Sequence, residues 1–274
     1  MIANVVHTAK RYYSLNHSFA NSLNHSLPKE PMDIILIHGF GEDHFVWKEF
    51  MNYLPKKHTY YTPDYATFTD CESIDDYVKW LKEFLRERDI ERCVLIGHSM
   101  GGYIALSFAE KHHEMVHGLG LFHSSAYPDD EERKATRLKT IEFIEKHGSE
   151  EFIKDFYPKM FTDDFKKKNK ALIESHIERY IVFSKRSLKN AQLAMRNRKD
   201  TTKVLKQASY PVMIIAGEED KFVAVDAAKE QIKLLKKGYT DVLSGVAHAG
   251  MFERPNECAK LVETFIAACS HIPV

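Results

Sequence analysis

Cysteine is scarce in this sequence and is not arranged in pairs. The 274 residues include four cysteines, at positions 71, 93, 258 and 269, and none of them is part of a CxxC motif. This scatter does not fit a disulfide framework and favours free thiols in a reducing compartment, for which the cytoplasm is the simplest prediction.

The sequence also lacks an excess of charge and a long apolar segment. Lysine and arginine together number 39, and so do aspartate and glutamate, so the formal net charge is zero and a nucleic-acid partner is not indicated. No stretch approaches the roughly 18 apolar residues that a membrane span requires, and residues 1–28 contain no apolar core of a secretion signal. We therefore expect no membrane span and no nucleic acid, while the oligomeric state is left open.

Apolar residues are abundant, and they follow two alternating patterns. The chain is 44% hydrophobic, which is ample for a large core. Short apolar runs alternate with longer stretches of helical period, which is typical of an α/β fold with a parallel sheet and helices on both faces. Strands are expected at 34–37, 60–63, 93–96, 116–122, 211–216 and 239–243, with one or two antiparallel edge strands within 5–27. Helices are expected near 45–54, 73–88, 101–111, 226–237 and 256–268.

One segment departs from this alternation. Between residues 125 and 208 the short apolar runs stop, and the sequence becomes densely charged with helical spacing. We interpret 125–208 as an inserted helical lid on a core domain formed by 1–124 and 209–274. Its recurring apolar residues, Phe152 and Phe156 among them, should mostly pack the lid onto the core, with a minority facing inward over a cavity.

A serine between glycines follows one of the expected strands. Residues 97–101 read Gly-His-Ser-Met-Gly and come directly after the apolar run 93–96. A strand-to-helix turn this tight pushes the central side chain above the sheet, and glycines two positions either side avoid a clash. The pattern predicts a nucleophile elbow with Ser99 as the nucleophile of a serine hydrolase.

A serine nucleophile needs a histidine base and a carboxylate that orients it. Asp220 follows the strand expected at 211–216, although Glu218 and Glu219 compete with it for the acid's role. His248 follows the last expected strand and has small neighbours, which leave its ring room to move over the serine. The order Ser99, Asp220, His248 is that of nucleophile, acid and base in hydrolases with a nucleophile elbow.

Acyl transfer also needs donors for the developing oxyanion. The loop 38–41 follows the first expected strand and would bring the backbone N–H of Phe40 beside that of Met100. His38 and His98 lie inside tight turns, and we interpret both as structural hydrogen-bonding residues. The pair His123 and His248 has no metal-ligand spacing and no evident carboxylate to complete a metal site, so no metal is expected.

Four motifs in this order resemble the α/β-hydrolase superfamily from about residue 31 to the end of the chain. They are HGFGED at 38–43, GHSMGG at 97–102, GEEDKFV at 217–223 and HAGMFERP at 248–255. The chain is most similar to the group of lidded serine esterases, enol-lactonases and C–C hydrolases. The resemblance implies an eight-stranded, mostly parallel sheet, a lid after the sixth strand, and Ser-His-Asp chemistry without a cofactor. Residues 64–68 replace the glycine-rich loop that is usual in this group.

These observations predict a hydrolase of carboxylic esters with small to medium acyl groups, acting on a small-molecule ester through an acyl-enzyme. Residues that flank the motifs would line a mainly apolar pocket: Phe40, Met100, His123, Phe222, Val223 and Met251. One alternative is a C–C bond hydrolase or enol-lactonase acting on a carboxylated ring-fission product. That reaction needs a cation near the site, and Arg254 or the lid residues Arg179, Lys185 and Arg186 could supply it. Another alternative is a ligand-binding protein without activity.

Overall fold

The structure is a computed structural model that describes residues 31–270. In these residues, six parallel strands form one sheet in the order β2-β1-β3-β4-β5-β6. Each strand expected within this part of the chain is present, with ends that differ by at most two residues. The strands are β1 (Asp33–Ile37), β2 (Thr59–Tyr61), β3 (Cys93–His98), β4 (Val116–Phe122), β5 (Val212–Gly217) and β6 (Gly238–Leu243).

The α/β class is confirmed, but the number of strands differs from the expectation. The described residues contain six strands, not eight. The edge strands expected within 5–27 lie outside the described residues. The long helical insertion follows β4, the fourth strand described.

The register of the sheet aligns the ends of strands that are far apart in sequence. Ile37 at the end of β1 pairs with Gly97 of β3, which pairs in turn with Leu121 of β4. On the other side, Gly217 of β5 pairs with Leu243 of β6. All strands run the same way, so the loops that follow them meet at one edge, which is where parallel α/β sheets place their functional groups.

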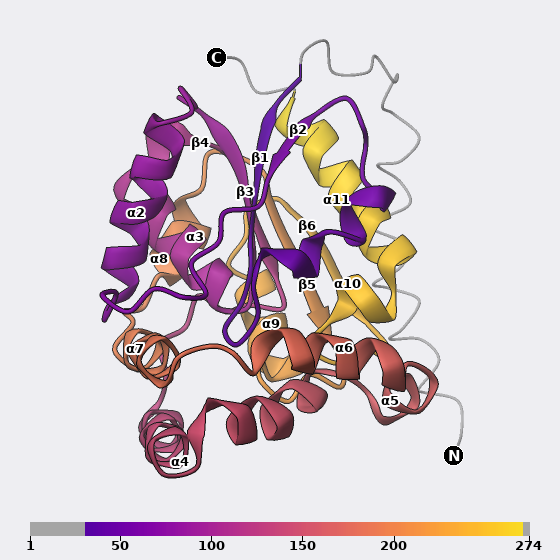
Figure 1. Ribbon diagram of the computed structural model, residues 1–274. Coiled ribbons are helices and arrows are strands. Elements are labelled where there is room, and N and C mark those ends of the chain that lie inside the picture. The colour runs from indigo at the N-terminus through magenta and orange to yellow at the C-terminus, as the bar shows by residue number, and fades with distance from the viewer. Residues whose placement is uncertain (1–30, 271–274) are drawn as a thin grey trace, which may run out of the picture. The chain divides into compact units, whose positions relative to one another are not determined.

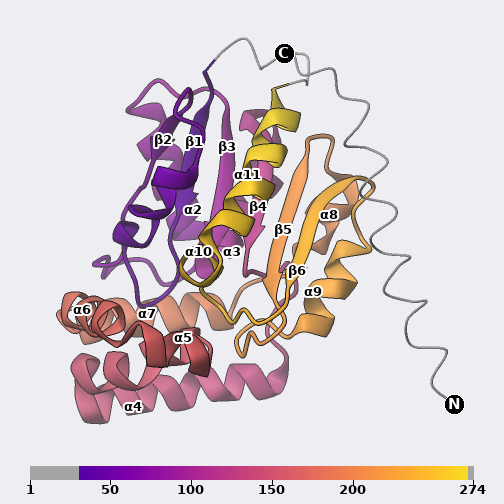
Figure 2. The ribbon, with the colours of Figure 1, turned by 90° about the vertical axis from the view of Figure 1, so that its right-hand side faces the viewer.

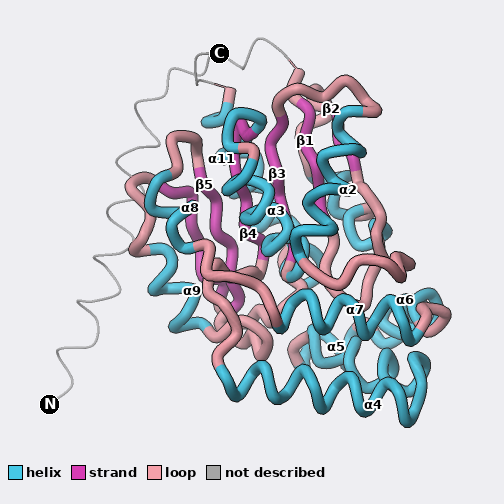
Figure 3. The backbone as a smooth tube through the Cα atoms, turned by 90° about the vertical axis from the view of Figure 1, so that its left-hand side faces the viewer, coloured by secondary structure: helices cyan, strands magenta, loops and turns pink. Residues whose placement is uncertain are grey.

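Helices cover both faces of the sheet (Figures 1 and 3). One face carries α2 (Ile74–Arg86), α3 (Met100–Lys111), α8 (Thr202–Gln207) and α9 (Val225–Ile232). The other carries α11 (Pro255–Cys269) with the short helices η1 (His44–Trp47) and η2 (Phe50–Tyr53). Two further short helices are η3 (His113–Met115) and α10 (Gly250–Glu253).

One helix is expected at 45–54, and this prediction is wrong. Two separate 3₁₀ turns, η1 and η2, occupy this segment. Asp43 caps the first turn by accepting a hydrogen bond from the N–H of Phe45. The second turn ends at Leu54, whose extended backbone suits its place before Pro55, because a residue before proline is disfavoured in the helical region.

A layer of helices covers the carboxyl edge of the sheet (Figure 2). It consists of α4 (Glu131–Phe156), η4 (Tyr157–Met160), α5 (Asp163–Lys168), α6 (Lys170–Tyr180) and α7 (Lys185–Arg196), and we call it the lid layer. Gly148 interrupts α4 with a positive φ of 93°. The layer is shorter than the segment 125–208, because α8 packs against α3 among the core helices. None of the helices in the described part of the chain is both long and apolar enough to cross a bilayer.

Candidate active site

Ser99 lies on the turn between β3 and α3 in a strained backbone conformation. Its φ is 49° and its ψ is −116°, a region that residues with a side chain rarely adopt. A Cβ on Gly97 would lie 2.3 Å from the backbone of Gly101, and a Cβ on Gly101 would lie 2.3 Å from the carbonyl oxygen of Ile37. The steric reason for glycine at both positions is therefore confirmed.

Hydrogen bonds from the end of β4 hold this turn in place. The N–H of Ser99 donates to the carbonyl of Phe122 at 3.0 Å, and the hydroxyl of Ser124 donates to the carbonyl of Ser99 at 2.7 Å. A strained residue persists only where its surroundings fix it, and these two bonds supply part of that restraint.

Asp220 and His248 form a direct buried contact. Oδ2 of Asp220 lies 2.7 Å from Nδ1 of His248, while Oδ1 accepts the backbone N–H groups of Phe222 and Val223 at 2.8 and 2.9 Å. Burial alone would raise the pKa of Asp220, but the charge of His248 and the hydrogen bonds outweigh it and hold this pKa well below its ordinary value. The competing acids, Glu218 and Glu219, are exposed.

Ser99 and His248 open onto the same cavity. No hydrogen bond between the described side chains joins the Ser99 hydroxyl to His248. In hydrolases without substrate this contact is commonly long and tightens only in the reacting complex. The structure thus places Ser99 and His248 on one cavity, with Asp220 bonded to His248.

The loop after β1 passes directly against the serine. A Cβ on Gly39 would lie 3.1 Å from the Cβ of Ser99. Within residues 31–270, neither the N–H of Phe40 nor that of Met100 donates a hydrogen bond. Two free donors beside the nucleophile are what an oxyanion hole requires.

His38 and His98 are structural hydrogen-bonding residues, as predicted. His38 is fully buried, and its Nε2 accepts the N–H of Tyr65 at 3.2 Å. The Tyr65 ring stacks on that of His38 at 3.9 Å, and its hydroxyl donates to the His38 carbonyl at 2.5 Å. His98 contacts Glu42 on one side and the backbone of His248 on the other. The unusual loop at 64–68 therefore supports the proposed oxyanion loop from behind.

The cavity has a volume of about 470 Å³ and is lined by both apolar and polar side chains. Aromatic rings surround the histidine, since Phe222 lies 4.9 Å from His248 and 5.3 Å from Phe156 between ring centres. The apolar lining comprises Phe40, Tyr103, Phe152, Phe156, Met160, Met195 and Phe222. The polar lining, besides Ser99 and His248, comprises Asp130, Glu132, Arg133, Thr136, Arg137, Thr140, Gln192 and Lys221. The pocket is therefore less apolar than the sequence suggested.

Three of the predicted pocket residues face elsewhere. His123, Val223 and Met251 are buried and do not belong to the cavity lining of the described chain, whereas Phe40 and Phe222 do. Adjacent residues in a tight loop point to opposite sides, so a position beside a motif is a poor guide to the cavity. The side chain of Met100 is also buried away from the cavity, which leaves only its backbone N–H for a role there.

The cations in the cavity wall are not those named from the sequence. Arg179 pairs with Asp43, Arg186 with Asp70, Arg254 with Glu257, and Lys185 donates to the backbone of Glu145. Instead, the first turns of α4 present Arg133, Thr136, Arg137 and Thr140 to the cavity. Their spacing of three and four residues is that of one helix face. Because α4 is charged on several faces, the sequence could not show which face turns inward.

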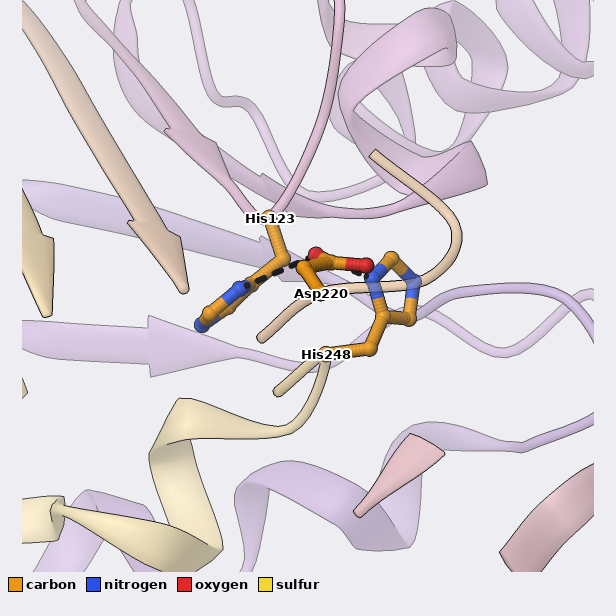
Figure 4. Close-up of side chains that lie close together, drawn as sticks. All are labelled: His123, Asp220 and His248. Carbon is orange, nitrogen blue, oxygen red and sulfur yellow. Dashed lines mark hydrogen bonds and ion pairs between the residues drawn. The ribbon is translucent and has the colours of Figure 1, made fainter. Parts of the chain in front are cut away.

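His123 completes a cluster that the sequence analysis did not anticipate. His123, Asp220 and His248 converge around one carboxylate oxygen (Figure 4). The expectation that no carboxylate lies near the two histidines is therefore wrong. Since the N–H of Gly250 donates to Nε2 of His123 at 3.2 Å, a neutral His123 carries its proton on Nδ1. That nitrogen lies 3.4 Å from Oδ2 of Asp220, which is a polar contact rather than a well-aligned hydrogen bond, since Nδ1 of His123 has no hydrogen-bond partner among the described residues.

The loop that carries His248 is tied to the lid layer. The N–H of His248 donates to the carbonyl of Met160 at 2.9 Å. The buried carboxylate of Glu253 accepts hydrogen bonds from the backbone N–H and hydroxyl of Thr162 and from the N–H of Ala247. The segment between η4 and α5 and the candidate base are thus held by a shared set of hydrogen bonds.

Comparison with known proteins gives a family match over most of the chain. Residues 34–261 match the sequence model described as the alpha/beta hydrolase family. An uncharacterized protein of Mycobacterium tuberculosis is 29% identical over 103 residues, which cover 35% of this chain and only 30% of that protein. Monoacylglycerol lipase abhd6-A of Xenopus laevis is 23% identical over 88% of this chain and 77% of its own length. For 2-hydroxy-6-oxo-6-(2'-aminophenyl)hexa-2,4-dienoic acid hydrolase of Metapseudomonas resinovorans, the identity is 23%, with 85% and 83% covered.

Solved structures show the same fold. A thermophilic esterase from Thermogutta terrifontis superposes with a TM-score of 0.81 at 21% identity, over 88% of this chain and 91% of the esterase. The enol-lactonase from Burkholderia xenovorans LB400 gives 0.78 at 17% identity, over 86% and 92%. At these identities the likeness concerns the fold, and the chemistry must be argued from the site.

Proposed function

The chain belongs to the alpha/beta hydrolase family, and on that premise we propose that it is a serine hydrolase that cleaves carboxylic esters of small to medium acyl groups. The observation that carries the proposal is the bonded pair of Asp220 and His248, which opens onto the same cavity as the strained Ser99. A nucleophile at an elbow, a histidine and an oriented carboxylate are the parts that acyl transfer requires.

In the proposed reaction, Nε2 of His248 takes the hydroxyl proton of Ser99 as the oxygen attacks the ester carbonyl. The N–H groups of Phe40 and Met100 bind the oxyanion, and Asp220 stabilises the imidazolium. The proton then passes to the leaving alcohol, and an acyl-enzyme remains on Ser99. Water, activated by the same histidine, hydrolyses that intermediate and regenerates the serine.

The cavity supports a small or medium acyl group. The aromatic lining residue Phe222 lies beside His248, and a volume of about 470 Å³ falls within the range of small-molecule sites. If the lid layer opens and closes over this cavity, it would exclude water during acylation. We retain the cytoplasm as the proposed compartment, since the cysteines are free thiols and three of the four are buried.

The direct test is hydrolysis of p-nitrophenyl esters from acetate to dodecanoate by the wild-type protein and by Ser99→Ala. We expect turnover that favours short chains and is lost in the variant, together with labelling of Ser99 by an organophosphonate. Turnover that survives Ser99→Ala would refute the proposal. Absence of both turnover and labelling would favour a ligand-binding role without catalysis.

A second candidate is favoured by the cations in the cavity wall. Arg133 and Lys221 line the cavity and form no ion pair with an acid of the described residues, so they are available to a substrate carboxylate, whereas Arg137 is paired with the buried Asp129. This composition supports cleavage of a C–C bond or an enol-lactone in a carboxylated ring-fission product. Labelling of Ser99 without turnover of any simple ester would move this candidate to first place.

A further inference from the structure

His123 is fully buried beside the candidate active site but does not touch the cavity. It follows β4 directly and holds a φ of 49°, the left-handed region that a residue with a side chain rarely adopts. Its backbone is bound firmly, because its N–H donates to the carbonyl of Ile215 in β5 at 2.8 Å. The strained backbone aims the ring at the loops after β5 and β6 rather than along the sheet.

The two ring nitrogens of His123 reach two different loops. Nε2 accepts the N–H of Gly250, which lies two residues after His248. Nδ1 lies 3.4 Å from Oδ2 of Asp220, the same oxygen that contacts His248. Figure 4 shows the carboxylate held between the two imidazoles. With the two N–H groups on its other oxygen, both carboxylate oxygens of Asp220 have contacts.

The contact with His123 requires a glycine at position 250. A Cβ at Gly250 would lie 2.5 Å from Nε2 of His123 and 3.1 Å from Sγ of Cys258. Only glycine lets the backbone N–H approach the buried ring closely. The close approach of Gly250 and the strained φ of His123 are separate features of the sequence, and both serve the same contact.

We propose that His123 is a positioning residue that clamps the loop of the acid Asp220 to the loop of the base His248. The inference rests on the proposed function, because it assigns His123 a role through the triad. His123 holds the two loops together without carrying a charge itself. Burial lowers the pKa of His123 to about 4, against the opposing interaction with Asp220, so the ring is neutral at physiological pH. Nδ1 of the neutral ring lies 3.4 Å from the carboxylate, and this polar contact restrains the carboxylate without adding a charge.

Two variants separate the two contacts. In His123→Asn the side-chain amide can replace the Nδ1 donor to Asp220 but cannot reach Gly250. In His123→Gln the longer side chain can accept from Gly250 but offers no donor at the Nδ1 position. His123→Ala removes both contacts, and His117→Asn, near the start of β4, is the matched control.

We expect His123→Asn to keep kcat within about threefold of the wild type, and His123→Gln and His123→Ala to lose about 10- to 100-fold in kcat, the scale of a misplaced catalytic group. KM should change little, since His123 does not line the cavity. A purely structural role would instead make kcat follow the melting temperature in all three variants. That result, or full activity in His123→Gln, would overturn the proposal.

A measurement on the wild-type protein guards against variants that fail to fold. Nitrogen NMR of ¹⁵N-histidine-labelled protein, assigned by comparison with His123→Asn or His123→Gln, should show His123 as the neutral tautomer protonated on Nδ1. The Nε2–H tautomer would contradict the clamp whatever the variants do. If ester hydrolysis persists in Ser99→Ala, the proposed function fails by itself. The tautomer of His123 still tests the contacts of its ring with Gly250 and Asp220.

Discussion

Nε2 of His98 donates to the backbone carbonyl of His248 at 2.9 Å, so the residue before the candidate nucleophile holds the candidate base. Nδ1 of the same ring lies 2.5 Å from the carboxylate of Glu42. A carbonyl and a carboxylate only accept, so both nitrogens carry protons and His98 is an imidazolium. Burial alone would lower the pKa of His98, but the charge of Glu42 and the two hydrogen bonds raise it above its ordinary value.

This ion pair predicts the effect of Glu42→Gln. The carboxylate of Glu42 also accepts the N–H of Gly39 in the proposed oxyanion loop, so its charge stabilises contacts with both His98 and Gly39. We expect the variant to lower the free energy of unfolding by about 2 kcal/mol, the range of hydrogen bonds to charged groups, and to lower kcat. Urea denaturation and ester hydrolysis measure the two effects, with the exposed Glu49→Gln as the control. Equal stability of the two variants would contradict the ion pair.

The buried neutral state of His123 predicts a loss of stability in acid. The folded protein takes up this proton near pH 4, whereas the unfolded chain takes it up near pH 6.5. This contribution to the free energy of unfolding is complete above pH 6.5 and decreases by about 3 kcal/mol as the pH falls to 4. Urea midpoints measured across this range should fall more steeply for the wild type than for His123→Asn. Parallel curves would mean that His123 is not buried as a neutral ring.

The contact between Gly250 and His123 predicts a coupled pair of substitutions. Gly250→Ala should destabilise the protein by about 1–3 kcal/mol, because the new Cβ meets the His123 ring. In the background of His123→Asn, whose shorter side chain removes that atom, the same change should cost less. A double-mutant cycle from thermal or urea unfolding gives the coupling energy. Strict additivity would show that the two residues do not touch.

The cations in the cavity predict a preference for an acyl chain that ends in a carboxylate. The ratio of kcat/KM for p-nitrophenyl hemiglutarate to that for p-nitrophenyl valerate should fall about tenfold in Arg133→Gln, since the charged partner of the distal carboxylate is lost. The control is Arg186→Gln, because Arg186 pairs with Asp70 outside the cavity. An unchanged ratio in Arg133→Gln would remove the support for a carboxylated substrate.

Much of the fold and of the candidate triad follows from local sequence patterns. The apolar runs mark the strands because buried parallel strands need continuous apolar side chains. Gly97 and Gly101 mark the elbow because a Cβ there would overlap the backbone. Such constraints act within a few residues, so they can be read before the chain is folded.

The sequence by itself determined the sheet, its helices, and the placement of Ser99, Asp220 and His248 after the strands β3, β5 and β6. Only the tertiary structure decided that His123 turns toward Asp220, that His98 pairs with Glu42, and that one face of α4 lines the cavity. These contacts join segments from 56 to almost 100 residues apart. Their geometry depends on how the strands register and how the lid layer packs, which no local spacing of residues encodes.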